Sequence, residues 1–100
     1  MPEGQGILSV AVWKPVPDRE AASLATLQEI SSILEAKGYG RDRLYCDRES
    51  HYVLLRYWTS LEARSVAQED PDLLRRWARL GNEIQIVKVY ETLTEISQAK

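Results

Sequence analysis

The sequence is poor in the residues that build several common kinds of site. Its 100 residues include one cysteine, Cys46, and one histidine, His51. A single cysteine excludes an intramolecular disulfide. One cysteine and one histidine also argue against a zinc centre built from this chain alone, because such a centre takes three or four protein ligands. These shortages exclude a disulfide-rich secreted scaffold and leave no metal site to expect.

No charge of one sign dominates, and no long apolar run occurs. Thirteen Lys and Arg stand against fifteen Asp and Glu, for a net charge of -2, whereas a nucleic-acid binder usually shows a basic excess. No apolar stretch approaches the ~20 residues that span a membrane. The first six residues lack the basic and apolar regions of a secretory signal. We therefore expect a cytoplasmic protein with no nucleic-acid partner and no membrane partner.

What the sequence does contain is enough apolar material, 44% of the chain, for one modest core. We expect a single domain with its core at about 7–93 and loose tails. The expected elements, in chain order, are a strand at 7–13, a helix at about 19–37, strands at 41–47 and 51–58, a helical region at 59–81 and a strand at 84–93. This β-α-β-β-α-β order is typical of a ferredoxin-like α+β protomer with one antiparallel sheet and both helical regions on one face.

Capping residues mark the expected helix ends. Asp18 is predicted to be the N-cap of the first helix, and Gly38 to end it in the left-handed conformation. Thr59 begins a capping box at the start of the second helical region. Asp70 is predicted to cap a fresh helical start, with Pro71 at the tolerated first position. A helix from there should close at a glycine near residue 81.

Several of the expected strands are apolar on both faces. Alternation puts Ile7, Ala11 and Trp13 on one face and Leu8, Val10 and Val12 on the other. In the last strand it puts Ile84, Ile86 and Tyr90 on one face and Val87, Val89 and Leu93 on the other. The helices cover one face of the sheet, and a monomer would leave the second apolar face exposed. A second copy related by a two-fold axis is the simplest cover, so we expect a homodimer.

The segment 57–63 (YWTSLEA), followed by Asp70, Pro71 and Trp77, resembles the antibiotic biosynthesis monooxygenase type of domain. In such domains the third strand ends in an aromatic–Trp pair, and a Ser-x-Glu-Ala helix start follows. The resemblance covers roughly 7–93 and implies a dimeric α+β barrel. It implies a small-molecule function less specifically, because the superfamily includes cofactor-free monooxygenases, haem-degrading enzymes and proteins of unknown role.

Individual positions narrow what the resemblance implies. Trp58 matches the Trp that the cofactor-free, quinone-forming monooxygenases use at the end of the third strand. Their Asn four residues earlier is Leu54 here, and their Tyr six residues later is Arg64. The haem-degrading branch uses a helical His as iron ligand, and Trp77 falls near that position. The resemblance therefore favours a reaction without cofactor or metal, on a flat aromatic or polyketide-like substrate, over haem binding or degradation.

Arg56 lies in the middle of an apolar strand, on the face that alternation shares with Tyr52, Leu54 and Trp58. A buried guanidinium needs a partner, because an isolated buried charge is costly. In one interpretation Arg56, Trp58 and Tyr52 are catalytic residues. Arg56 and Trp58 would hold the substrate and stabilise its charge, and Tyr52 would hydrogen-bond it. In the other interpretation, Arg56 pairs with an Asp or Glu across the strands or across the dimer.

Trp13, Trp77 and His51 are the candidate substrate-binding residues. The tryptophans fit the wall of an aromatic pocket, and they fit an ordinary core equally well. Histidine is a common general base, but His51 adjoins a polar turn where a solvated side chain is commoner. Three functions stay open: a cofactor-independent monooxygenase, a non-catalytic ligand-binding or stress-associated homodimer, and, least favoured, haem binding or degradation.

A basic cluster lies on the second helical region. It consists of Arg75, Arg76 and Arg79, with Arg64 upstream. Acidic residues are interleaved with these arginines, which indicates a solvated, salt-bridged surface rather than an anion-binding site.

Overall fold

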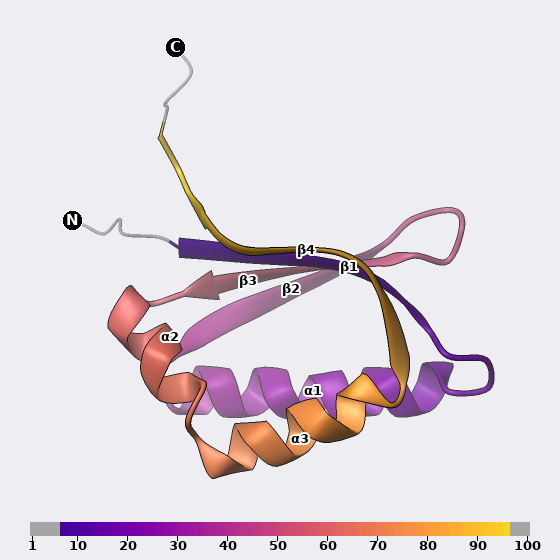
Figure 1. Ribbon diagram of the computed structural model, residues 1–100, viewed down its shortest axis with the longest axis horizontal. Coiled ribbons are helices and arrows are strands. Elements are labelled where there is room, and N and C mark those ends of the chain that lie inside the picture. The colour runs from indigo at the N-terminus through magenta and orange to yellow at the C-terminus, as the bar shows by residue number, and fades with distance from the viewer. Residues whose placement is uncertain (1–6, 97–100) are drawn as a thin grey trace.

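The computed structural model describes residues 7–96 (Figure 1). Its elements are β1 (Ile7–Pro15), α1 (Glu20–Ala36), β2 (Gly40–Cys46), β3 (Tyr52–Trp58), α2 (Leu61–Ala67), α3 (Pro71–Gly81) and β4 (Ile84–Thr94). The predicted order is confirmed, with the second helical region divided into α2 and α3. The tails expected at the two ends fall largely on residues 1–6 and 97–100, which lie outside the described residues.

The four strands form one sheet in the order β2-β3-β1-β4, and every neighbouring pair is antiparallel. The helices lie together below this sheet in Figure 1, and the upper face is left uncovered. This arrangement confirms the ferredoxin-like α+β protomer. No helix among residues 7–96 has the length and apolar character needed to cross a bilayer.

Alternation along β3 decides which side chains face the helices. Tyr52, Leu54, Arg56 and Trp58 are all buried, as the shared face predicted, while the residues between them are more exposed. Two buried clusters form beneath the sheet. The Trp58 cluster contains Ile7, Ile30, Leu34, Trp58, Ala67 and Leu73, and the Trp13 cluster contains Trp13, Leu27, Tyr52 and Leu54.

Three of the predicted helix ends are confirmed: Gly38 follows α1, Asp70 caps α3, and α3 ends at Gly81. Gly38 follows α1 with a φ of 74°. The amide of the next residue, Tyr39, donates to the carbonyl of Leu34 at 2.9 Å, so an orphan carbonyl of the last turn is satisfied. Asp70 caps α3, and its carboxylate accepts a bond from the Asp72 amide at 2.9 Å.

Two predicted N-caps were wrong by one residue each. Asp18 has a φ of 70°, so it occupies the turn before α1, and Arg19 takes the N-cap position. Thr59 donates its hydroxyl to the Gly38 carbonyl at 2.8 Å. Ser60 caps α2 instead, accepting from the Ala63 amide at 2.9 Å. The residue types indicated a helix end correctly, but a neighbour took the terminal position.

Two register shifts in the β1–β4 pairing correct the predicted faces of β4. They fall between Leu8 and Val10 and between Val12 and Trp13. Ile86 therefore opposes Trp13 while Tyr90 opposes Val10, so these two residues do not share a face as strict alternation predicts. Each irregularity adds a residue to one strand and moves the subsequent side chains of that strand to the other side. Val89 consequently sits opposite Ala11, on the side of the helices.

Candidate functional site

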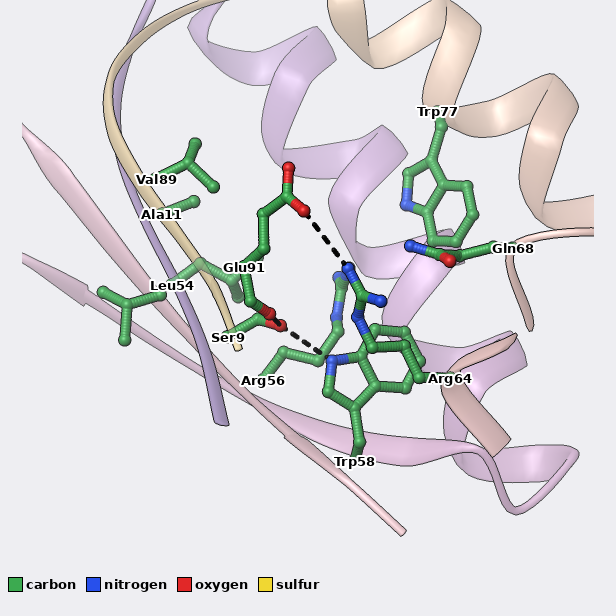
Figure 2. Close-up of a pocket in the computed structure, with 11 residues that line it drawn as sticks. Ser9, Ala11, Leu54, Arg56, Trp58, Arg64, Gln68, Trp77, Val89 and Glu91 are labelled. Carbon is green, nitrogen blue, oxygen red and sulfur yellow. Dashed lines mark hydrogen bonds and ion pairs between the residues drawn. The ribbon is translucent and has the colours of Figure 1, made fainter. Parts of the chain in front are cut away.

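A cavity of about 480 Å³, here called the Trp58 cavity, lies between the sheet and the α2–α3 region. Figure 2 shows its lining residues converging from β1, β3, β4 and both helices. Those that matter for its chemistry are Ser9, Arg56, Trp58, Arg64, Trp77 and Glu91. The volume falls in the range of about 300–1,000 Å³ that small-molecule sites occupy.

Two indole rings wall the cavity. Trp58, at the end of β3, is 5% exposed, and its Nε1 donates to the Ser9 hydroxyl at 2.8 Å. That hydroxyl donates in turn to the backbone carbonyl of Glu91 on β4, so the ring orientation is fixed from two strands. Trp77 reaches in from α3 and is half-buried (Figure 2). The site therefore offers flat apolar surfaces to a ligand.

Arg56 forms an ion pair across the strands. It stands opposite Asp42 on β2, and its Nε and Nη2 donate to the two carboxylate oxygens at 2.7 and 2.8 Å. The two side chains are 10% and 5% exposed. Ser31 on α1 also donates to Asp42. Of the two interpretations from the sequence, the structure therefore shows the ion pair, although Arg56 also lines the Trp58 cavity, 5.8 Å from the Trp58 ring.

Arg64 on α2 is a lining residue that the charge pattern did not identify. Its side chain is 18% exposed, and its Nη2 lies 3.6 Å from Glu91 Oε1. Its Nε is buried and finds no hydrogen-bond partner within residues 7–96. The useful signal was positional: Arg64 stands where the monooxygenases that the sequence resembles carry a functional Tyr.

Tyr52 and Trp13 pack together away from the cavity. Their rings stack with centroids 4.6 Å apart and planes 19° from parallel. The Tyr52 hydroxyl donates to the Glu20 carboxylate, and this bond, assisted by burial, raises the pKa of Tyr52 to about 12. Tyr52 lies six positions before Trp58, which corresponds to about 20 Å along an extended strand. The prediction assigned both residues to one pocket because they share a face, and it did not take their separation along the strand into account.

His51 also lies elsewhere, at the β2–β3 hairpin. Its Nδ1 is 3.4 Å from Asp47 Oδ2, and both groups lie near Glu49. Asp47 Oδ1 accepts the backbone N–H groups of His51 and Glu49 at 2.9 and 2.7 Å. These bonds, that of His51 first, lower the pKa of Asp47. The geometry is that of a carboxylate-stabilised turn. None of the predicted residues Tyr52, Trp13 and His51 is among the described residues lining the Trp58 cavity.

The remaining arginines of the basic cluster are salt-bridged, as predicted. Arg75 pairs with Asp72 at 2.7 Å. Arg76 and Arg79 pair with Glu29 of α1 at 2.9 and 2.8 Å. The hydrogen bond from Arg79, with that from Arg76, lowers the pKa of Glu29. Arg64 differs from all three, because it points into the fold.

No protein-family model matches the chain, and no curated protein matches its sequence. Solved structures match its fold. A variant of SnoaB, a cofactor-independent oxygenase from Streptomyces nogalater, superposes with a TM-score of 0.82 at 15% identity, covering 95% of this chain and 97% of that one. Rv0793 from Mycobacterium tuberculosis gives 0.78 at 21% identity, covering 96% and 100%. An antibiotic biosynthesis monooxygenase gives 0.75 at 13% identity, covering 91% and 99%. The chain therefore has the fold of the antibiotic biosynthesis monooxygenase proteins, as the segment around Trp58 predicted.

Proposed function

We propose that this protein binds a flat aromatic or polyketide-like molecule in the Trp58 cavity and oxygenates it without a cofactor. The observation that carries the proposal is the cavity itself, walled by Trp58 and Trp77 and lined by two guanidinium groups. The fold it shares with SnoaB, a cofactor-independent oxygenase, supports the reaction class. Fold alone does not specify a reaction, so the argument depends on the site.

The proposed reaction converts a phenol to a quinone. The phenol loses its O–H proton, and the ring carbon opposite the oxygen forms a C–O bond with molecular oxygen, which is reduced to the peroxide level. The peroxide takes up a proton. The O–O bond then breaks as that ring carbon loses its hydrogen, so one phenol and one O₂ yield one quinone and one water. The step that needs the protein is formation of the anion, whose charge a preorganised cation stabilises.

The residues of the cavity divide this work. Trp58 and Trp77 position the ring system, and the bond from Trp58 to Ser9 keeps one wall rigid. The guanidinium groups of Arg56 and Arg64 supply positive charge, and Asp42 holds that of Arg56 in place while partly offsetting it. Tyr52 takes no part, because its hydroxyl is committed to Glu20 in the Trp13 cluster. The catalytic set is therefore smaller than the one the sequence suggested.

A second candidate function, ligand binding without catalysis, has one observation in its favour. Among the described residues lining the Trp58 cavity, Glu91 carries the sole carboxylate, and its side chain is 78% exposed. A general base should lie within hydrogen-bond reach of the proton it removes. An exposed carboxylate at the rim meets this demand poorly.

Oxidation of a hydroxylated anthrone, whose enol tautomer is a fused-ring phenol, separates the two functions. The protein would be mixed with 1,8-dihydroxyanthrone in air, and quinone formation followed by absorbance, with ¹⁸O₂ tracing the new oxygen. We expect the wild type to accelerate labelled quinone formation and Trp58→Ala to lose that acceleration. Quenching of tryptophan fluorescence by the anthrone without any acceleration over buffer would leave binding and refute catalysis.

The proposal includes a homodimer. The uncovered face of the sheet carries Leu55 and Val10 opposite each other at its centre, with Tyr57 and Tyr90 exposed by 42% and 44%. We expect Leu55→Glu to yield a monomer, because it would bury a charge in the interface. Leu74→Glu, at a site 46% exposed on α3, is the matched control and should stay dimeric. Light scattering after size-exclusion chromatography measures both, and a monomeric wild type would refute the dimer.

A further inference from the structure

We propose that the ligand of the Trp58 cavity carries an ionised oxygen, a phenolate or a carboxylate, and that Arg64 binds this oxygen in exchange for Glu91. The inference rests on the proposed binding function and is independent of oxygenation. It assigns the anion-binding role to a residue other than Arg56, the arginine that the sequence placed in the site.

The first argument is charge balance. Arg56 donates two hydrogen bonds to the carboxylate of Asp42, at 2.7 and 2.8 Å, and both side chains are buried. A bidentate pair of this kind is near its full hydrogen-bond strength, so Arg56 has little to gain from a second anion. The cation left without a buried counter-ion in the cavity lining is Arg64.

The second argument is the bonding of Arg64 itself. Its Nη2 is 3.6 Å from Glu91 Oε1, which is too long for a hydrogen bond. Its Nε is buried without a hydrogen-bond partner in the described chain. A buried donor that is left unsatisfied carries a desolvation penalty, and a ligand oxygen that accepts from it removes that penalty. Arg64 therefore favours an anion over a neutral ligand.

The third argument concerns Glu91, which holds Arg64 only loosely. Its side chain is 78% exposed, so its carboxylate keeps its water when Arg64 turns away. Figure 2 shows it reaching from β4 toward the Arg64 guanidinium. An aromatic anion that enters between the indoles would thus replace a solvent-screened partner with a buried one, and charge-assisted bonds are stronger there.

Matched pairs of probes test this directly. Naphthalene-2-carboxylate is compared with naphthalene-2-carboxamide, which has nearly the same shape without the charge. The phenolate of 2,4-dinitro-1-naphthol, ionised at neutral pH, is compared with its methyl ether. Fluorescence titration or calorimetry gives each dissociation constant. We expect at least one anion to bind about 10-fold to 100-fold more tightly than its neutral partner, and the preferred pair identifies the source of the oxygen.

Variants then assign the preference to a residue. Arg64→Gln should abolish the preference for the anion, with a much smaller loss of affinity for the neutral probe. Arg64→Lys should keep part of the preference, because a single ammonium lacks the fork of a guanidinium. Glu91→Gln should tighten binding of the anion by removing its competitor. Arg75→Gln is the matched control, since Arg75 is 66% exposed and pairs with Asp72 outside the cavity.

The outcomes distinguish this inference from the proposed function. Equal binding of charged and neutral probes, or an anion preference that survives Arg64→Gln in a folded variant, overturns the role of Arg64 and leaves the aromatic site standing. Failure of every probe to bind overturns both. Circular dichroism and thermal unfolding of Arg64→Gln provide the check that the variant is folded.

Discussion

The Trp13 and Trp58 regions beneath the sheet are similarly buried but differ in what lies opposite the indole ring. Trp13 is 2% exposed and Trp58 is 5% exposed, and both face the helices. Tyr52 stacks against Trp13 and fills the space opposite it. Trp58 instead faces a cavity of about 480 Å³. Burial alone therefore does not separate a core residue from a site residue; the occupant of the space opposite the ring does.

The two arginines of the Trp58 cavity repeat the contrast. Arg56 forms a buried bidentate pair with Asp42, which the hairpin register brings directly opposite. Arg64 has an exposed, distant partner and a buried donor without one. Arg56 therefore contributes mainly to stability and to a fixed field, and Arg64 is the group with bonding capacity left for a ligand.

The largest expected effect comes from truncating the tryptophans. Trp13→Ala should lower the free energy of unfolding by about 3–5 kcal/mol, because it opens a void in a filled core. Trp77→Ala should cost less stability, because the side chain is half-buried and borders space that already exists. It should weaken binding of naphthalene-2-carboxylate by about tenfold, from lost ring stacking. Urea unfolding and fluorescence titration measure the pair, and equal stability losses would contradict the contrast.

Removing the partner of each arginine sharpens the second contrast. Asp42→Ala leaves the Arg56 charge buried and unpaired, which typically costs about 3–5 kcal/mol. Glu91→Ala should change stability by less than about 1 kcal/mol, because an ion pair whose carboxylate is largely exposed contributes little. Chemical unfolding of the two variants side by side is the measurement. A Glu91 variant as unstable as the Asp42 variant would show that Arg64 depends on its partner after all.

A smaller effect concerns the support of Trp77. Asp70 caps α3, the helix that carries Trp77, and its carboxylate accepts bonds from Lys37 Nζ and Tyr39 Oη, each at 2.8 Å. These bonds, that of Lys37 first, lower the pKa of Asp70 from its usual 3.8 to about 2. Its stabilising contribution is complete above pH 3.8 and is lost as the pH falls through about 2.

Asp70→Asn keeps an N-cap acceptor but removes this charge. We expect it to unfold more easily at neutral pH and to show a shallower loss of stability between about pH 4 and pH 2. Thermal unfolding across that range measures the slope. A slope identical to that of the wild type would mean that Asp70 contributes no pH dependence.

The sequence was sufficient for the architecture because that information is local. Continuous apolar strands, the Gly38 helix end and the Asp70 cap each follow from a few neighbouring residues. The burial of alternate residues on β3 followed from the two-residue period alone. The register shifts in β4 were not predictable in this way, because they depend on how β1 pairs with it, and they moved Val89 to the helix side.

The site was harder to predict than the fold, because its composition depends on distances between residues that a sequence does not contain. Tyr52 and Trp58 share a face of β3, but the length of the strand keeps them apart. Of the predicted site residues, the cavity lining includes Arg56, Trp58 and Trp77. Arg64 was grouped with surface arginines because the charge pattern does not show which way a seven-residue helix turns its side chains. The resemblance to the monooxygenases indicated that position 64 belongs to the site, whereas the charge pattern did not.

Native mass spectrometry with excess naphthalene-2-carboxylate tests the central claim, that the space between Trp58 and Trp77 is a ligand site, most directly. It reports subunit number and bound mass together. The account predicts a dimer that carries one ligand per subunit, with a lower ligand occupancy in folded Trp77→Ala and an unchanged occupancy in Arg75→Gln. A protein that binds no ligand, or a Trp77→Ala variant that binds it as fully as the wild type, would contradict the account.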